Sequence, residues 1–404
     1  MNEDAVTRRL VVAVASAACA LLASACTSSS TPQSTGTPAS SVPATPTATS
    51  PSAPSNAEPG AWRLLPPAPV KKPMFGVAAA WDGTDVFVSG RVCPQETPGF
   101  TQTVAYRPST NTWRTLPRFT GPRGCFEGGD NAIWDGKELL LIGITNAAYS
   151  PDTNTWRKLP PGGRGNFAQV AAWTGHQTLG FGGGCCGEAY DMVRSFTPST
   201  NSWSDPPRSP LGGRNGVFGA WDGKELIVAG GAREETNGFH TFATGAAYDA
   251  AAKTWRTIAT LPAPRQDAAA VWDGSQVLVV GGSRIGTSAT HYYSRGLSFD
   301  PSTNQWNALP PMAYPRTAAA AVWTGSQLLV WGGATVASHG TVPPPHGEAF
   351  DPSTNRWSPL AKSPLRGRDD PAAVWTGSQM FIWGGQATDG DTFFYDGALY
   401  TPGG

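Results

Sequence analysis

The sequence predicts an all-β fold of seven repeats, because three series of landmark residues recur in phase along the chain. The first series is the tryptophan of a Trp-Asp/Thr-Gly turn: Trp81, Trp134, Trp173, Trp221, Trp272, Trp323 and Trp375. The second is an aromatic residue at the end of a third strand: Tyr106, Tyr149, Phe196, Tyr248, Phe299, Phe350 and Tyr400. The third is a tryptophan in a fourth strand: Trp62, Trp113, Trp156, Trp203, Trp255, Trp306 and Trp357. Seven four-stranded repeats of roughly 50 residues predict a seven-bladed β-propeller.

Each repeat alternates short strands with turn signals, as residues 316–360 show. The small residues of 317–322 suit the crowded centre of a propeller, and the apolar run 328–331 suits a strand that is covered on both faces. The Asp-Gly dipeptide of the first turn predicts a type I′ hairpin with positive φ at both central residues. In the turn Asp-Pro-Ser-Thr-Asn, proline presets φ and asparagine tolerates the left-handed region.

The order of the landmarks predicts how the ring of blades closes. The first landmark, Trp62, belongs to a fourth strand, whereas the last, Tyr400, belongs to a third strand. The C-terminal repeat therefore lacks its own fourth strand, and the N-terminal stretch supplies a spare one. We expect residues 61–66 to pair beside residues 393–401 and to complete the seventh blade, because closure removes the open edges between the first and last blades.

The glycine pairs, such as Gly332-Gly333, together with the Tyr/Phe and Trp landmarks, resemble kelch repeats. The resemblance covers residues 61–404 and implies a kelch-type propeller of the galactose oxidase superfamily. Three repeats depart from the pattern, and their departures are Ser89-Gly90 and the single Gly143 in place of a glycine pair, and Asp249-Ala250-Ala251 in place of Asp-Pro-Ser. Because the pattern recurs in phase, these departures weaken single repeats and not the array.

Residues 1–26 have the pattern of a secretory signal. Arg8-Arg9 precede an apolar run of 16 residues, which is shorter than a membrane span of about 20 residues. Ala23-Ser24-Ala25-Cys26 resembles a bacterial lipobox, which implies cleavage before Cys26 and lipidation of its thiol. We therefore expect a bacterial lipoprotein that is extracytoplasmic and lipid-anchored to the cell membrane. A plain secreted protein, an uncleaved anchor and twin-arginine export stay open as alternatives.

Residues 27–60 are rich in Ser, Thr, Pro and Ala and carry almost no charge, so they predict a disordered linker before the propeller of residues 61–404. The chain has a formal net charge of zero and 14% charged residues. Because the sequence shows no basic stripe, nucleic acid is not an expected partner. We expect a monomer that meets the membrane through its lipid anchor.

Four cysteines remain in the predicted propeller, and four cysteines allow three pairings. Cys93 lies in the predicted loop between the second and third strands of the first blade, and Cys125 lies at the start of the second blade. These segments are neighbours on one face and export favours oxidation, so we favour a Cys93–Cys125 disulfide. Cys185 and Cys186 would then form a vicinal disulfide or stay free.

The loops between second and third strands and the connections between blades share one face of the propeller, which we call the loop-rich face. These segments vary in length, so this is the predicted functional face. Tyr292 and four histidines lie in such segments of three adjacent blades: His240, His291, His339 and His346. Imidazoles bind copper and zinc, and galactose oxidase, which the chain resembles, holds copper at its axis. The sequence has no tight ligand spacing and no counterpart of the thioether cysteine, so we favour solvated histidines and expect no cofactor.

Arginines precede the first-turn tryptophan by seven residues in four blades: Arg214, Arg265, Arg316 and Arg368. A ring of guanidinium groups at the mouth of the channel would bind a carboxylate or a phosphate. Alternatively, each arginine pairs with carbonyl and carboxylate groups between blades, and we favour this structural role for most of them. Periplasmic kelch proteins that mutarotate sialic acid offer an analogy for the first role.

The sequence favours a binding or interaction module over an enzyme. Its partner, a protein or a cell-envelope glycan, is expected on the loop-rich face. The alternative is an extracytoplasmic enzyme that acts on carbohydrate, either a copper oxidase of the galactose oxidase type or a mutarotase of sialic acid. The sequence contains no phosphate loop, zincin helix or nucleophile elbow.

Overall fold

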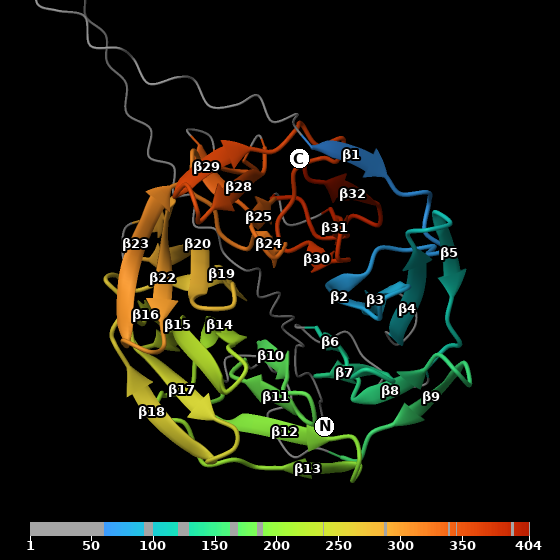
Figure 1. The fold of residues 1–404 in the computed structure, drawn as a ribbon, viewed down its shortest axis with the longest axis horizontal. Helices are drawn as coiled ribbons and strands as arrows, with labels where there is room; N and C mark the ends of the chain where they lie inside the picture. The colour runs from blue at the N-terminus through green and yellow to red at the C-terminus, as the bar shows by residue number, and fades with distance from the viewer. Residues whose placement is uncertain are drawn as a thin grey trace, which may run out of the picture. The chain divides into compact units, whose positions relative to one another are not determined.

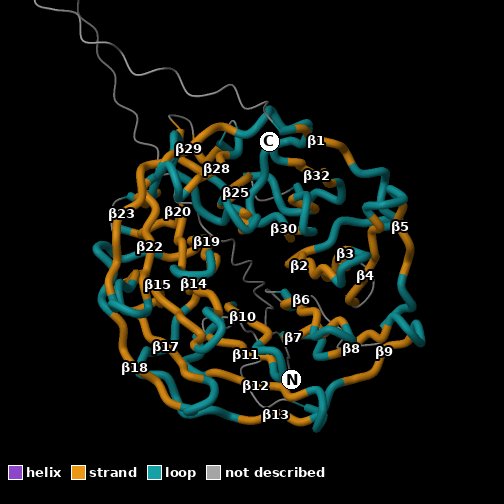
Figure 2. The backbone as a smooth tube through the Cα atoms, in the orientation of Figure 1, coloured by secondary structure: helices purple, strands orange, loops and turns teal. Residues whose placement is uncertain are grey.

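The protein is known from a computed structural model that describes residues 60–92, 100–119, 129–161, 169–183, 189–236, 238–286, 289–337, 340–344, 346–388 and 392–403. The stretch Ala57–Gly404 forms one compact unit. Strands and loops alternate along its described length, as the tube in Figure 2 shows. Within these ranges there is no helix with the length and apolar character that a membrane crossing requires.

The described strands form seven four-stranded sheets, the blades, which are arranged around a common axis (Figure 1). From the inner to the outer strand, blades 1 to 3 are β2 (Phe75–Trp81), β3 (Val86–Val92), β4 (Phe100–Arg107) and β5 (Thr112–Thr115); β6 (Asn131–Trp134), β7 (Leu139–Ile142), β8 (Ala147–Ser150) and β9 (Thr155–Lys158); and β10 (Val170–Trp173), β11 (Thr178–Phe181), β12 (Val193–Thr197) and β13 (Ser202–Ser204). All strand pairs within these blades are antiparallel.

Blades 4 to 7 follow the same order. They are β14 (Asn215–Trp221), β15 (Glu225–Glu235), β17 (Gly245–Asp249) and β18 (Thr254–Ile258); β19 (Gln266–Trp272), β20 (Val277–Ile285), β22 (Arg295–Asp300) and β23 (Gln305–Pro311); β24 (Ala320–Trp323), β25 (Leu328–Trp331), β28 (Glu348–Asp351) and β29 (Arg356–Pro359); and β30 (Ala372–Trp375), β31 (Met380–Trp383), β32 (Gly397–Thr401) and β1 (Ala61–Leu64). The predicted all-β, seven-bladed propeller is therefore confirmed.

Three hairpins extend blades 4, 5 and 6 on the loop-rich face, because each lies between a second and a third strand. β16 (Gly238–Thr241) pairs with the end of β15, and β21 (Thr290–Tyr292) pairs with the end of β20. In blade 6, β26 (Thr335–Ala337) and β27 (Gly340–Val342) pair with each other. The variable segments thus stand on one face of a uniform scaffold.

The first strand of the propeller closes the last blade, as predicted. β1 pairs antiparallel with β32, so that Trp62 lies opposite Tyr400. The inner strands contact one another around the full circle, and β30 of blade 7 contacts β2 of blade 1. Closure by β1 therefore joins the two ends of the unit through a continuous ladder of backbone hydrogen bonds, which leaves no open edge between blades 7 and 1.

The fourth-strand tryptophans link neighbouring blades. In each of the seven blades of the described part, the indole N–H donates to a backbone carbonyl of the preceding connection, as from Trp62 to Ala361 at 2.8 Å and from Trp357 to Pro310 at 2.9 Å. Each indole also packs on the third-strand aromatic ring of its own blade, with centroids 4.9 to 5.2 Å apart. The fourth-strand tryptophans and the third-strand aromatic residues therefore form one ring contact that is repeated in all seven blades. In each blade the indole N–H has a hydrogen-bond acceptor, as buried tryptophans usually do.

The turn between the first and second strands differs from the predicted type I′ turn. In blade 1 it spans residues 82–85, and Gly83 has a φ of 96° whereas Asp82 does not have a positive φ. The carboxylate of Asp82 accepts the N–H of Asp85 at 2.6 Å. Because the aspartate side chain holds the turn closed, only the glycine needs the left-handed region.

The turn between the third and fourth strands confirms the role expected for asparagine. Five of these turns place asparagine at a φ between 48° and 57°: Asn111, Asn154, Asn201, Asn304 and Asn355. In blade 4, where the Asp-Pro-Ser pattern is lost, Lys253 takes this position with a φ of 55°. The left-handed residue is thus required by the turn, and asparagine is the residue that adopts it at low cost.

The second strands form the buried middle of the blades. β25 and β31 are buried at every position, which confirms that these apolar runs are covered on both faces. Apolar clusters also join adjacent blades: Leu226 and Val228 of blade 4, for example, share a cluster with Leu179 and Phe181 of blade 3. The core is therefore a set of layers between blades, as expected for a repeat array.

Candidate functional site

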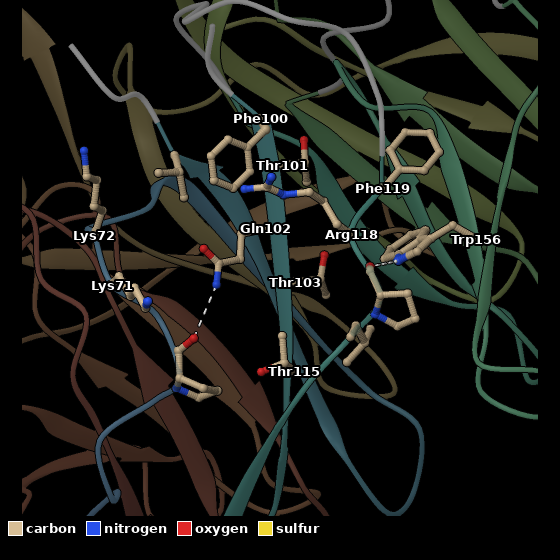
Figure 3. Close-up of a pocket in the computed structure, with 14 residues that line it drawn as sticks. Lys71, Lys72, Phe100, Thr101, Gln102, Thr103, Thr115, Arg118, Phe119 and Trp156 are labelled. Atoms are coloured by element: carbon tan, nitrogen blue, oxygen red, sulfur yellow. Dashed lines mark hydrogen bonds between the residues drawn. The ribbon is translucent and has the colours of Figure 1, made fainter. Parts of the chain in front are cut away.

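A pocket of about 430 Å³ lies on the loop-rich face at blade 1, and we call it the blade 1 pocket (Figure 3). Its floor is the start of β4, and its walls are the connections that lead into and out of blade 1. The lining residues are Pro69, Lys71, Lys72, Val92, Phe100, Thr101, Gln102, Thr103, Thr115, Leu116, Pro117, Arg118, Phe119 and Trp156. This volume falls within the range of small-molecule sites, about 300–1,000 Å³.

After the buried Leu116, the described residues 117–119 of the connection from blade 1 to blade 2 bury no apolar side chain at the pocket. In five other connections one apolar side chain is buried between the blades: Val70, Leu211, Leu261, Met312 and Leu365. Phe119 holds the matching place, two residues after the carbonyl of Pro117 that accepts the indole N–H of Trp156. Phe119 is only half-buried and lines the pocket instead of filling it.

The floor of the pocket also presents a backbone carbonyl that accepts no N–H from the described residues 116–119. In blade 4 the N–H of the plug Leu261 donates to the carbonyl of Ala243 at 2.8 Å. Thr101 is the equivalent residue of blade 1, and no backbone N–H of residues 116–119 donates to its carbonyl. The carbonyl of Thr103 accepts the N–H of Leu116 at 3.4 Å, and alternate carbonyls of a strand point the same way. The Thr101 carbonyl therefore faces the pocket.

The pocket is cationic. Lys71, Lys72 and Arg118 line it, and no described lining residue is acidic. None of the three forms an ion pair with a residue that the structure describes. The guanidinium carbon of Arg118 lies 4.2 Å from the centroid of the Phe100 ring, and Figure 3 shows the two side chains together at the head of the pocket. Unpaired cations in a concave site attract anions.

Comparison of the blades explains why Arg118 is available. In three other blades, the arginine that precedes the inner strand stacks on the equivalent aromatic ring: Arg214 over Phe242 at 4.1 Å, Arg265 over Tyr293 at 4.3 Å and Arg368 over Phe394 at 3.9 Å. Blade 1 has the buried Met74 in the place of this arginine. Arg118 comes from the next connection and stacks on Phe100 from the solvent side, where it stays exposed.

A buried polar network ties the floor of the pocket to blade 2. The hydroxyl groups of Thr101 and Thr145 lie 2.7 Å apart, and the N–H of Thr145 donates to Asp130 at 2.7 Å. Arg91, which is 1% exposed, donates to the Thr101 hydroxyl at 3.4 Å. Burial raises the pKa of Asp130, although the bonds from Thr145 and the charge of Arg91 oppose this rise. The network fixes Thr101 by several bonds, so the floor is preorganised.

The four predicted arginines are buried, and their guanidinium groups bind backbone carbonyls. Each donates from Nη1 to the first glycine of the pair in its own blade: Arg214 to Gly230 at 3.1 Å, Arg265 to Gly281 at 2.9 Å, Arg316 to Gly332 at 3.2 Å and Arg368 to Gly384 at 3.1 Å. The second glycine of the preceding blade donates back to the arginine carbonyl, as from Gly231 to Arg265 at 2.8 Å. These contacts agree with the structural role that we favoured from the sequence, in which the arginines bind carbonyl groups between blades. We call these four residues the latch arginines.

Burial also affects the charge of the latch arginines. Desolvation lowers the pKa of Arg214 and that of Arg265 to about 10, so both stay charged at neutral pH. Arg316 pairs with the buried carboxylate of Glu348 at 2.7 Å, and Arg368 pairs with Asp396 at 2.6 Å. Their donors are thus directed into the blades.

The predicted histidines do not converge. His240 and His291 are exposed on the hairpins of blades 4 and 5, next to the half-buried Tyr292, and His346 is half-buried in blade 6. Each packs edge-on against an aromatic ring: His240 on Phe242 and His291 on Tyr293, both at 4.7 Å, and His346 on Tyr314 at 5.4 Å. His339 lies outside the described residues. Across the described ranges no three His, Cys, Asp or Glu side chains are grouped to hold a metal, so these donors do not fit a copper centre.

Two carboxylates lie near the axis, where the inner strands begin. Asp267 and Asp370 have φ values of 51° and 52°. The N–H of Ala318 donates to the backbone carbonyl of Asp267, and the backbone N–H of Asp370 donates to the carbonyl of Ala318. Burial, with a smaller contribution from the charge of Asp370, raises the pKa of Asp267 to about 6. Burial likewise raises the pKa of Asp370. This axial mouth is acidic, so the unpaired cations that suit an anion are those of the blade 1 pocket.

The predicted lipidation site and disulfide cysteines lie outside the described residues. They are Cys26, Cys93, Cys125, Cys185 and Cys186. Cys93 directly follows Val92, which lines the blade 1 pocket. The lipid anchor and the Cys93–Cys125 pairing stay predictions.

Sequence reasoning missed Lys71, Lys72, Arg118 and Phe119. The signal that points to them is a break in a series, because blade 1 carries Met74 where four other blades carry an arginine. A repeat that loses a structural residue frees the groups around it for another use. The gap alone does not single out blade 1, because Glu127 and Asn166 stand seven residues before the first-turn tryptophan in blades 2 and 3.

Comparisons with known proteins agree with the fold. The KLHDC2/KLHL20/DRC7 Kelch-repeats domain matches residues 148–333. The structure is similar to a fungal alcohol oxidase of the AA5 family solved in complex with copper, with a TM-score of 0.60, 16% identity, and 85% of this chain and 76% of that chain covered. At this identity the likeness supports the fold.

The curated relatives differ in what they do. The kelch-like protein terF of Aspergillus terreus is 26% identical over 356 residues, which are 85% of this chain and 67% of the fungal one. An N-acetylneuraminate epimerase of Haemophilus influenzae is 29% identical over 224 residues, which are 52% of this chain and 56% of the epimerase. Beta-scruin of Limulus polyphemus is 27% identical over 183 residues, which are 41% of this chain and 18% of scruin. The chain thus spans less than two thirds of the latter two relatives.

Proposed function

We propose that the protein is a binding module of the cell envelope that holds its partner on the loop-rich face, at the blade 1 pocket. The observation that carries this proposal is the pocket itself. It combines aromatic and hydroxyl groups with three cations that form no ion pair with a described residue, and it lies in a blade without a latch arginine. A pocket with a few polar groups on a rigid scaffold is the usual form of a ligand site. The partner is a protein or an envelope glycan that presents an anionic group.

The proposal is tested by photo-crosslinking in the native cells. Phe119 is replaced by benzoylphenylalanine in the full chain, and a matched variant carries the same residue at Ser302, in a turn of the opposite face. We expect a defined adduct from the Phe119 variant and none from the Ser302 variant. An adduct from Ser302 alone, or equal adducts from both positions, would contradict a partner on the loop-rich face.

The membrane attachment is part of the same proposal. We propose that the protein is an extracytoplasmic lipoprotein with a lipid on Cys26, because residues 1–26 carry the signal pattern described above. Metabolic labelling with a lipid probe should label the full chain and should not label the Cys26→Ala variant. A label that survives this substitution, or an unlabelled parent protein, would remove the anchor.

A second candidate is an extracytoplasmic enzyme that acts on carbohydrate. The similarity to an N-acetylneuraminate epimerase favours it, although the aligned part is 56% of that enzyme. The latch arginines direct their N–H groups into the blades, so they do not present an anion site. The described His, Cys, Asp and Glu side chains do not group to hold copper. NMR of anomer exchange in N-acetylneuraminate with the full chain decides: acceleration that the His291→Ala variant loses would favour the enzyme, and an unchanged rate would reject it.

A further inference from the structure

We infer that the blade 1 pocket takes the phosphate ester of a sugar, with Arg118 as the main contact to the phosphate. This inference rests on the proposed function and names the ligand class of the same pocket. Three features of the pocket carry it: the surplus of positive charge, the stacked guanidinium of Arg118, and the hydroxyl, carbonyl and aromatic groups around them.

The charge of the pocket suits a phosphate. Lys71, Lys72 and Arg118 bring three positive charges, and no acidic group balances them among the described lining residues. A carboxylate carries one negative charge, whereas a phosphate monoester carries between one and a half and two at neutral pH. A guanidinium binds two phosphate oxygens through its fork, and lysines add point charges beside it. Three cations without an acid therefore match a phosphate better than a carboxylate.

Arg118 is held ready for such a contact. Its guanidinium lies on the Phe100 ring at 4.2 Å, which fixes the orientation of the planar group. The latch arginines that stack on the equivalent rings of other blades donate to carbonyls, as Arg214 does to Gly230, whereas no described residue accepts a hydrogen bond from Arg118. Since a fixed side chain loses less entropy on binding, the stack favours affinity for an anion.

The rest of the pocket suits a sugar ring. The Thr101 carbonyl and the Thr115 hydroxyl offer partners for sugar hydroxyl groups, and the amide of Gln102 donates to the Pro69 carbonyl at 3.5 Å, which leaves its oxygen free to accept. On the opposite wall, the ring centroids of Phe119 and Trp156 lie 5.6 Å apart, and the two ring planes are inclined by 48°. Such rings give an apolar surface for the C–H face of a sugar.

An acidic peptide fits the pocket less well. Peptides that add a strand need a free sheet edge, whereas β4 lies between β3 and β5. The pocket is also closed on both sides by the connections into and out of blade 1, so its 430 Å³ suit a compact ligand and not an extended chain. A peptide is therefore an outcome of the test and not the proposal.

The test is calorimetric titration of the full chain with matched small probes. Glucose 6-phosphate should bind at least tenfold more tightly than glucose, than glucuronic acid and than inorganic phosphate. Vesicles of phosphatidylcholine with phosphatidylinositol present a phosphodiester of a ring polyol. Binding to these vesicles in excess of pure phosphatidylcholine would place the phosphate ester in a lipid headgroup, and binding to glucose 6-phosphate alone would place it in a soluble sugar.

Two variants separate the pocket from the general surface charge. Arg118→Gln should weaken binding of the phosphate ester at least tenfold. Arg208→Gln is the matched control, because Arg208 also follows a connection proline whose carbonyl accepts an indole N–H, and its side chain is 77% exposed. Arg208→Gln should leave the affinity unchanged. Phe119→Ala should weaken glucose 6-phosphate and leave inorganic phosphate unchanged.

Each contrary outcome identifies what has failed. Glucuronic acid that binds as tightly as glucose 6-phosphate would overturn the choice of phosphate, and inorganic phosphate that binds as tightly would overturn the sugar. Binding of a hexaglutamate peptide in place of the sugar phosphate, with the same loss in Arg118→Gln, would overturn the ligand class and leave the pocket as the binding site. No binding by any probe, together with a crosslink from Phe119, would overturn this inference and leave the proposed function. No binding by any probe, together with no adduct from Phe119, would overturn both this inference and the proposed function.

Discussion

Arg316 and Glu348 form an ion pair inside blade 6. The two side chains are 0% and 3% exposed, and their nearest nitrogen and oxygen lie 2.7 Å apart. Arg316 also donates to the carbonyls of Gly332 and His346. Burial lowers the pKa of Arg316, and the charge of Glu348 opposes this effect. The pair is therefore a structural unit and not a free anion site.

The Arg316→Met variant tests this role. We expect its free energy of unfolding to fall by about 3–5 kcal/mol, because Glu348 would be left buried without a partner. Guanidinium chloride unfolding measures the loss, with Arg208→Gln as an exposed control that changes it by less than about 0.5 kcal/mol. If Arg316→Met unfolds like the parent protein, the latch arginines do not hold the blades together.

Asp267 should make stability depend on pH. Its folded pKa of about 6 lies above the ordinary value of 3.8, so the folded state holds the proton more tightly than the unfolded state. The resulting stabilisation is complete below pH 3.8 and is lost as the pH rises through about 6. Asparagine tolerates the left-handed φ of this position and carries no charge. Asp267→Asn should therefore gain stability relative to the parent protein as the pH rises from about 4 to 7.

Unfolding midpoints of the two proteins in denaturant, measured side by side at several pH values, give this difference. Carboxyl groups that do not interact with Asp267 contribute equally to both proteins and cancel, whereas the charge of Asp370 acts on Asp267 and is part of the measured difference. A difference that stays constant with pH would show that Asp267 has an ordinary pKa in the folded protein.

At the scale of elements, the glycine pairs allow neighbouring blades to approach closely. A Cβ on Gly281, which has a φ of 67°, would lie 2.4 Å from the carbonyl oxygen of Arg316 in the next blade. Gly274, in the first turn of the same blade as Gly281, has a φ of 102°, and a Cβ there meets nothing within 4 Å. Both positions disfavour a side chain because of φ, but Gly281 adds a clash with the neighbouring blade.

Alanine at each position separates the two effects. Gly274→Ala should cost about 1–2 kcal/mol for the left-handed conformation. Gly281→Ala should cost about 1–3 kcal/mol more, because the backbone of the next blade must shift to admit the methyl group. Equal melting temperatures for the two variants would mean that the glycine pair serves the local turn and not the contact between blades.

The repeated elements were predictable from sequence, and the broken one was not. The Trp, Tyr/Phe and Asn landmarks each follow from one local contact that recurs, such as the indole bond from Trp357 to Pro310. The type I′ turn was wrong because the side chain of Asp82 closes the loop, a contact that the dipeptide alone does not reveal. In blade 1, Phe119 is not buried as the apolar residues of other connections are, and Met74 stands where four other blades have an arginine. Such differences can be recognised only after the structure has shown which positions of the blades are equivalent.

At the scale of the whole unit, closure by β1 is expected to govern stability. Trp62 pairs with Tyr400, and its indole donates to Ala361 at 2.8 Å, so one short strand joins blade 7 to the connection before it. Deleting residues 61–66 should sharply lower the melting temperature of the unit, because it exposes the edge of β32 and the apolar cluster beneath Trp62. Deletion of six residues from 27–60 is the control for chain length. A truncated protein that melts like its parent would mean that the ring does not need this seam.

The fold and the function meet in the choice between two sites on the same propeller. The axial mouth bears carboxylates such as Asp370, whereas the blade 1 pocket bears Lys71, Lys72 and Arg118. An anionic ligand should therefore avoid the axis and bind in the blade 1 pocket. This off-axis site is the central claim.

A crystal structure of the full chain with glucose 6-phosphate tests it most directly. The account predicts density for the phosphate against the guanidinium of Arg118, with the sugar ring between Gln102 and the wall of Phe119 and Trp156. Density at the axial mouth beside Asp370, or a blade 1 pocket that is empty at a saturating concentration of the ligand, would contradict it.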